Sequence, residues 1–143
     1  MSSPAENVAK LKDAYRQWHE SKGGSVKLWL DLMADHVRVR SLAAGAPEAR
    51  FTSEINSRAD FERYFKGLLE DWEMIDYTTT VFIAEGDHVA MRGSTAWRNR
   101  RTGRVVDTPK ADFWTFKDGK IVEFHELYDT AAMFAAAERH TGC

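Results

Sequence analysis

The hydrophobic period of this sequence changes once, at Trp72, and that change constrains the fold more than any other feature. Before Trp72, apolar residues recur at steps of three and four, which is typical of amphipathic helices. From there to residue 128, apolar and polar residues alternate, as they do in half-buried strands. Glycine-containing connectors at residues 85–87, 101–103 and 118–119 are typical of tight hairpins. The pattern predicts an α+β fold in which helices precede a meander of four antiparallel strands.

Capping signals and apolar spacing set the expected elements. Ser3 and Glu6 form a capping box around Pro4, and Ser25 and Ser57 can each cap a further helix. Helices are expected over residues 4–21, 25–34, 57–72 and 129–140. Strands are expected over residues 37–41, 50–53, 77–84, 88–100, 104–117 and 121–128.

Length and charge limit the classes of partner. The chain has 143 residues and a formal net charge of −2, so we expect residues 1–143 to form a single domain. A charge so close to zero offers no general attraction for nucleic acid or an anionic membrane. No apolar run is long enough to cross a bilayer. We therefore expect neither nucleic acid nor membrane as a partner.

The reactive side chains do not suggest a metal or a cofactor. The single cysteine, Cys143, cannot form an intramolecular disulfide or a paired-cysteine metal site. The five histidines lack metal-binding spacing, and the sequence has no Walker loop or dinucleotide fingerprint. The first residues lack the basic and apolar regions of a secretory signal. The expectation is a cytoplasmic protein with no metal site and no cofactor.

The segment over residues 113–123, Phe-Trp-Thr-Phe-Lys-Asp-Gly-Lys-Ile-Val-Glu, is followed by Tyr128-Asp129. This pattern resembles the SnoaL-like and ketosteroid isomerase-like families, which share the cone fold of nuclear transport factor two. The resemblance extends over residues 7–134. It implies a cone-shaped, curled antiparallel or mixed sheet with the three N-terminal helices packed on its concave face. Such families include isomerases, polyketide cyclases, epoxide hydrolases, dehydratases and proteins without catalysis, and their pocket lies inside the cone.

Strand alternation and the resemblance together select four candidate catalytic residues. Alternation is expected to place Arg92, Asp112 and Glu126 on the inner face. Glu126 is similar in position to the acid/base carboxylate of SnoaL-like cyclases, and Arg92 to an arginine beside the catalytic water of limonene epoxide hydrolase. Tyr15 and Asp112 resemble the oxyanion-stabilising pair of ketosteroid isomerases, a system in which a tyrosine and a protonated aspartic acid act together.

Two positions depart from these family patterns. Ser94 stands where the epoxide hydrolase has an aspartate, and Ser41 stands where the steroid isomerase has its general base. A hydroxyl without an activating partner is a poor base near neutral pH. The resemblance therefore implies neither of these two mechanisms in its complete form.

The chain is rich in aromatic residues, with five Trp, eight Phe and four Tyr, which either fill a core or line a pocket. We expect a cavity of roughly a few hundred Å³, the usual size for a small ligand. Its expected ligand-binding residues are Trp18, Trp29, Trp114, Phe124 and Tyr128. The predicted function is binding of a small, mainly apolar organic molecule, with cofactor-free acid/base chemistry of the isomerase, cyclase or hydratase type. The alternative is a non-catalytic binding or association domain in which the polar residues brace the sheet.

The opposite face of the sheet predicts an assembly. Alternation is expected to place Met91, Trp97 and Phe113 there, with Thr95 and Thr115, and an exposed apolar patch of this kind marks an interaction site. We therefore expect a homodimer through the outer sheet face. The basic run over residues 98–104 is expected to be a solvated hairpin tip.

Overall fold

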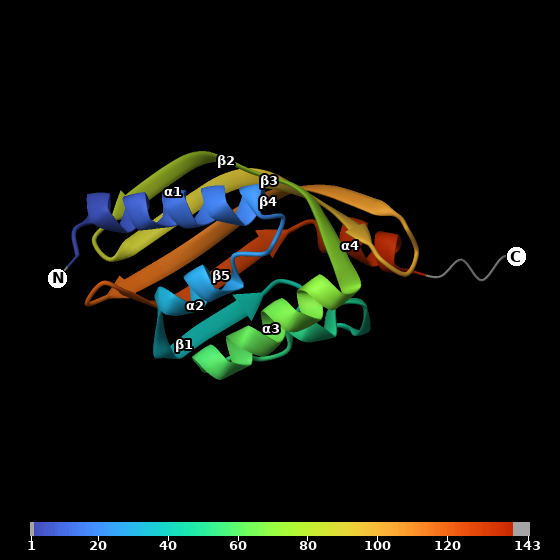
Figure 1. Ribbon diagram of the computed structural model, residues 1–143, viewed down its shortest axis with the longest axis horizontal. Coiled ribbons are helices and arrows are strands. Elements are labelled where there is room, and N and C mark those ends of the chain that lie inside the picture. Colours follow the sequence, from blue (N-terminus) through green and yellow to red (C-terminus); the bar gives the residue numbers. More distant parts are fainter. Residues whose placement is uncertain (1, 139–143) are drawn as a thin grey trace, which may run out of the picture.

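One curled five-stranded sheet and the helices on its concave face organise the computed structural model, which describes residues 2–138 (Figure 1). The elements are α1 (Pro4–Glu20), α2 (Val26–Asp31), β1 (Met33–Ser41), the 3₁₀ helix η1 (Pro47–Thr52), α3 (Arg58–Asp71), β2 (Trp72–Glu85), β3 (His88–Asn99), β4 (Val105–Lys117), β5 (Lys120–Tyr128) and α4 (Thr130–Ala137). Helix α4 ends at Ala137, and Glu138 is extended, so this helix ends earlier than expected. Cys143, with residues 139–140 of the predicted terminal helix and the last residues of the expected domain, lies outside the described residues.

The sheet is mixed, with the strand order β1-β5-β4-β3-β2. Strands β2 to β5 form the expected antiparallel meander, and β1 adds to its edge in parallel with β5. Helix α1 packs against β2 and β3, and α3 packs against β1 and β2. This arrangement confirms the predicted α+β class with a curled mixed sheet and helices on the concave face (Figure 1).

Local sequence signals explain why the two long helices begin where they do. The Ser3 hydroxyl accepts a hydrogen bond from the Glu6 amide, and Ser57 caps α3 in the same way through the Asp60 amide. These bonds satisfy backbone donors that the first turn of a helix leaves free. Each helix buries an aromatic stripe against the sheet, which includes Tyr15 on α1 and Tyr64 on α3.

Several expected boundaries were wrong, among them the start of β1, which lies at Met33 rather than at residue 37. Helix α2 ends at Asp31, before residue 34, because the next residues join β5: the Leu32 carbonyl accepts a hydrogen bond from the Ile121 amide at 2.8 Å. Residues 50–53 are not a strand, since most of them belong to η1. Strand β2 begins at Trp72 rather than at residue 77.

The basic hairpin tip between β3 and β4 is attached to α4 instead of being free in solvent. The Thr102 hydroxyl donates to the Ala136 carbonyl at 2.5 Å. Arg104 donates to the carbonyls of Ala135 and Glu138 at 3.0 and 3.1 Å. Because the last carbonyls of a helix have no partner within the helix, these contacts cap the C-terminus of α4.

Within residues 2–138, no helix is both long enough and apolar enough to span a membrane.

Candidate functional site

A cavity of about 90 Å³ lies between the helices and the concave face of the sheet. The five residues expected to contact a ligand all line it: Trp18, Trp29, Trp114, Phe124 and Tyr128. The cavity is smaller than the few hundred Å³ expected, because the aromatic rings fill much of the space. Trp114 stacks on Trp29 at a centroid distance of 5.2 Å and on Phe124 at 4.0 Å.

Strands β4 and β5 bring two carboxylic acids together at this cavity. Asp112 is paired with Glu126, and Trp114 with Phe124, in the antiparallel register. Directly opposed residues point to the same side of a sheet. Both acids are buried among the helices on the concave side, with exposures of 0% for Asp112 and 3% for Glu126.

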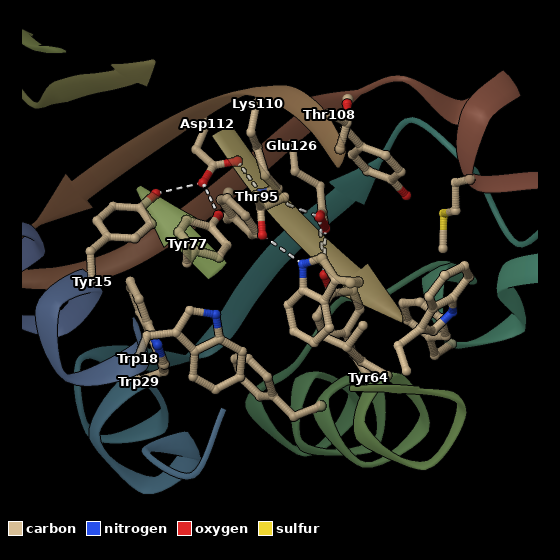
Figure 2. A pocket seen from close by; sticks show the side chains of 18 of the residues that line it. Tyr15, Trp18, Trp29, Tyr64, Tyr77, Thr95, Thr108, Lys110, Asp112 and Glu126 are labelled. Carbon is tan, nitrogen blue, oxygen red and sulfur yellow. Dashed lines mark hydrogen bonds and ion pairs between the residues drawn. The ribbon is translucent and has the colours of Figure 1, made fainter. Parts of the chain in front are cut away.

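Asp112 accepts hydrogen bonds from three side chains (Figure 2). Lys110 Nζ donates to Oδ1 at 2.5 Å. The hydroxyls of Tyr15 and Tyr77 donate to Oδ2 at 2.5 and 3.1 Å. Three donors, one of them a cation, stabilise the ionised form of a buried carboxyl. Asp112 therefore has more hydrogen-bond support for a negative charge than Glu126 has.

The negative charge of Glu126 is stabilised by fewer donors than that of Asp112. The Tyr64 hydroxyl donates to Oε2 at 2.5 Å, but Lys110 Nζ lies 3.6 Å from Oε1. Burial raises the pKa of Glu126, Lys110 opposes this increase, and the charge of Asp112 adds to it. The net effect is a raised pKa, which makes Glu126 the carboxyl able to carry a proton within the cavity.

Lys110 supplies the positive charge of the site. Burial is the largest single effect and would lower the pKa of its ammonium group. Asp112, Tyr77 and Glu126 together outweigh burial, so the pKa of Lys110 is raised well above its ordinary value. Nζ also lies 5.5 Å from the ring centroids of Tyr77 and Phe124. The ammonium therefore stays protonated and is unsuited to act as a base or a nucleophile.

Four tyrosines keep their protons and act as hydrogen-bond partners. Burial, and then the charge of Asp112, raises the pKa of Tyr15 and Tyr77. Burial, and then the charge of Glu126, does the same for Tyr64 and Tyr128. The Tyr128 hydroxyl lies 2.6 Å from the hydroxyl of Ser41, the residue that stands at the steroid isomerase's base position.

The expected placement of Arg92 was wrong. Arg92 is exposed and is paired with Ala111, so it lies on the outer face, away from Asp112. Lys110 takes the place that the sequence had suggested for Arg92. The pattern of Lys110, Asp112 and Trp114 at alternate positions of one strand is the signal that could have identified it.

The same register error affected other residues of β3. Met91, Thr95 and Trp97 are buried on the inner side, whereas they were expected on the outer face. Phe113 does lie outside and is 48% exposed. Tyr64 was not predicted as a site residue, because helical spacing does not predict a hydrogen bond from α3 to Glu126 on β5.

Within the described part of the chain, no three His, Cys, Asp or Glu side chains are grouped so that they could hold a metal ion.

Comparison with known structures shows many proteins of the same fold. An NTF2-like protein from Burkholderia pseudomallei has a TM-score of 0.79 at 17% identity, covering 93% of this chain and 98% of that one. A protein with a ketosteroid isomerase-like fold from Catenulispora acidiphila, in complex with trimethylamine, has a TM-score of 0.71 at 15% identity, covering 94% of both chains. TerC, co-crystallised with polyporic acid, has a TM-score of 0.77 at 18% identity, covering 96% of this chain and 100% of that one. At these identities the likeness establishes the fold alone.

No protein of curated function matches the sequence significantly. The model of the SnoaL-like domain family, in contrast, matches residues 12–124. This match includes α2, α3 and most of the sheet, with Lys110, Asp112 and the start of β5. Because the match extends over more than half of the sequence, the chain belongs to the SnoaL-like domain family.

Proposed function

We propose that the cavity binds a small, mainly apolar organic molecule and that Glu126 exchanges a proton with it. The observation that carries this proposal is the unequal support of the two buried acids. Lys110 lies 2.5 Å from Asp112 but 3.6 Å from Glu126. One cation cannot neutralise two carboxylates, so the less supported acid holds the exchangeable proton.

The proposed chemistry is redox-neutral and of the isomerase, cyclase or hydratase type. As a carboxylate, Glu126 removes a proton from a carbon or oxygen of the ligand, and as an acid it returns the proton to another atom. Tyr64 and Lys110 stabilise the carboxylate before the first step and after the second, and between the two steps Glu126 holds the ligand's proton as the neutral acid. Lys110, Asp112 and Tyr15 then act as positioning residues, which fix the charge beside Glu126.

The aromatic wall limits the ligand's size and polarity. A cavity of roughly 150 Å³ holds benzene in a protein core, and the cavity here measures about 90 Å³. A ligand with an aromatic ring therefore has to displace a wall side chain. Two structural neighbours, TerC with polyporic acid and the trimethylamine complex, are themselves bound to small organic molecules, which agrees with the proposal.

Hydrogen–deuterium exchange of an enolisable ketone tests the proton transfer. With acetophenone in D₂O, followed by ¹H NMR, we expect the protein to accelerate exchange of the methyl protons. The Glu126→Gln substitution should lower this rate by about 100-fold or more, because positioned acid/base groups contribute about 10²–10⁴. The control is Glu123→Gln, on the exposed side of the same strand. This variant should accelerate exchange of the ketone's methyl protons as much as the parent protein does.

A second candidate function is non-catalytic binding, with the polar cluster as a brace. Tyr15 on α1 and Tyr64 on α3 both donate to acids of the sheet, so the cluster joins the helices to the strands. If bracing is its only role, Glu126→Gln will change the melting temperature and leave both ligand affinity and ketone exchange unaltered. That outcome would decide against Glu126 as the acid/base group.

A further inference from the structure

The tryptophans on the cavity wall differ in what their indole N–H groups contact. Trp97 donates to the Thr95 hydroxyl at 2.7 Å, and Trp114 donates to the Tyr15 hydroxyl at 2.8 Å. The Nε1 groups of Trp29 and Trp72 are also buried, but they have no acceptor among the residues that the structure describes. All four side chains line the same cavity.

An unpartnered buried donor is unfavourable, and native proteins contain few of them. Trp29 is 3% exposed and Trp72 is 1% exposed, so neither can reach bulk water without a rearrangement. Two such donors on the wall of one cavity indicate that the acceptors belong to the bound molecule. They also account for tryptophan at these positions, since phenylalanine would supply the apolar surface without the N–H.

The two donors lie on either side of the acid/base cluster. The inward side chains of β4 follow the order Val106, Thr108, Lys110, Asp112 and Trp114. Trp29 stacks on Trp114 at one end of this row, with an angle of 6° between the rings. At the other end, Val106 is paired with Trp97 on β3, and Trp72 is paired with Asn99 two residues further along β3. Glu126, opposite Asp112, therefore lies between them; Figure 2 shows Trp29 on the side of Tyr15.

The surroundings also define the ligand's shape and charge. Three of the wall rings form one nearly parallel stack, with 6° between Trp29 and Trp114 and 17° between Trp114 and Phe124, and a flat molecule can extend such a stack. An anionic ligand would face Asp112 and Glu126 with only Lys110 as a cation. Neutral oxygen acceptors, such as carbonyls, suit both indole donors without adding negative charge.

We infer that the ligand is a flat, neutral, mainly apolar molecule with two oxygen acceptors, one toward each end, which accept hydrogen bonds from Trp29 and Trp72. Its central part lies beside Glu126. This inference rests on the proposed function and adds the substrate class: a conjugated dicarbonyl or similar compound. It also assigns Trp29 and Trp72 as ligand-binding residues of a specific kind, hydrogen-bond donors rather than apolar wall.

Three probes of nearly the same shape test the inference: 1,4-diacetylbenzene, 4-isopropylacetophenone and 1,4-diisopropylbenzene, with two, one and no acceptors. Their affinities are measured by quenching of tryptophan fluorescence and by the indole signals in ¹⁵N–¹H NMR spectra. We expect 1,4-diacetylbenzene to bind on the order of tenfold more tightly than the hydrocarbon. The indole signals of Trp29 and Trp72 should move strongly, and those of Trp97 and Trp114, whose N–H groups have partners, should move less.

Variants separate the hydrogen bonds from packing. Trp29→Phe and Trp72→Phe should each lose part of the preference for the diketone, whereas Trp97→Phe, the matched control, should keep it. If the hydrocarbon binds as tightly as the diketone, the inference about acceptors is wrong and the proposed binding function stands. If none of the three probes binds, the proposed function and the inference both fail. The NMR comparison uses the parent protein, so it holds even if a variant does not fold.

Discussion

At the scale of single residues, the site shows how two similar acids acquire different roles. Asp112 and Glu126 are neighbours across two strands, and both are buried. The Asp112 carboxyl group accepts three hydrogen bonds, whereas among the described residues the Glu126 carboxyl group accepts hydrogen bonds only from Tyr64. The distribution of donors, rather than the type of side chain, therefore determines which acid holds an exchangeable proton.

The contrast between Lys110 and Arg92 gives a direct test of this arrangement. Lys110→Met leaves two buried acids without their cation, and breaking a buried charge pair costs about 3–5 kcal/mol. Arg92→Met removes an exposed charge on the outer face and should change the free energy of unfolding by less than about 0.5 kcal/mol. Urea unfolding measures both. Equal effects of the two substitutions would contradict the structure's placement of the cation.

The raised pKa of Glu126 also predicts a pH dependence of stability. Because the folded state holds this proton above the ordinary value of 4.5, the native state binds more protons than the unfolded state in that range. Stability is therefore lost as pH rises from 4.5 through the folded pKa. Glu126→Gln should lack this loss. As pH rises, the free energy of unfolding of the variant should therefore increase relative to that of the parent protein. Glu123→Gln, on the exposed side, should keep the parent profile.

At the scale of elements, Gly93 allows β3 to approach β2 closely where the sheet bends. A Cβ atom at this position would lie 2.0 Å from the Thr78 carbonyl oxygen. The register of β2 and β3 shifts nearby, between Thr79 and Val81. Since the neighbour is backbone, it cannot move aside as a flexible side chain would.

Gly93→Ala is therefore expected to destabilise the fold by about 1–3 kcal/mol, the usual cost of overpacking. Differential scanning calorimetry provides the measurement, with Ser94→Ala on the next, half-buried residue as the control. A melting temperature for Gly93→Ala that matches the control would show that the close approach is not required.

The elements with local signals could be predicted from sequence, and those that depend on distant pairing could not. Ser3 and Ser57 mark the starts of α1 and α3, and the glycine turns mark the hairpins. Strand β1 extends back to Met33 because it pairs in parallel with Ile121 at the far end of the chain. No local pattern contains that information.

The candidate site was predictable to the extent that hydrophobic alternation was followed. Val89, Met91 and Trp97 share one face of β3, and these large apolar side chains point inward. The expected alternation placed Arg92, which resembles an arginine of an epoxide hydrolase, on the inner face, and this assignment was wrong by one residue. Tyr64 on α3 donates to Glu126 on β5, and Tyr77 on β2 donates to Asp112 on β4. These hydrogen bonds join elements that are far apart in the sequence, so only the three-dimensional structure shows them.

At the scale of the whole molecule, the outer sheet face remains partly apolar. Ile83 is 66% exposed, Phe113 48% and Leu127 37%. Ile83 and Phe113 both pair with Ala90, so they lie in one row across three strands. A contiguous apolar patch on a sheet face favours association, and we propose that this face joins two copies of the chain.

Sedimentation velocity at micromolar concentration tests this proposal. We expect a dimer for the parent protein, and a shift toward monomer for Phe113→Asp, because a buried unpaired charge opposes association. The control is Asp107→Asn, which changes an exposed residue of the same strand. A parent protein that sediments only as a monomer would rule out the dimer.

We propose that Glu126 retains its proton inside the cavity above the ordinary pH range of a glutamate carboxyl group. NMR titration of protein labelled with ¹³C at the glutamate carboxyl groups measures this directly, with Glu126→Gln used to assign the signal. We expect a Glu126 titration midpoint above the ordinary value of 4.5, with a further change when 1,4-diacetylbenzene binds. A midpoint at or below that value, unaltered by the ligand, would show that Glu126 does not hold the exchangeable proton.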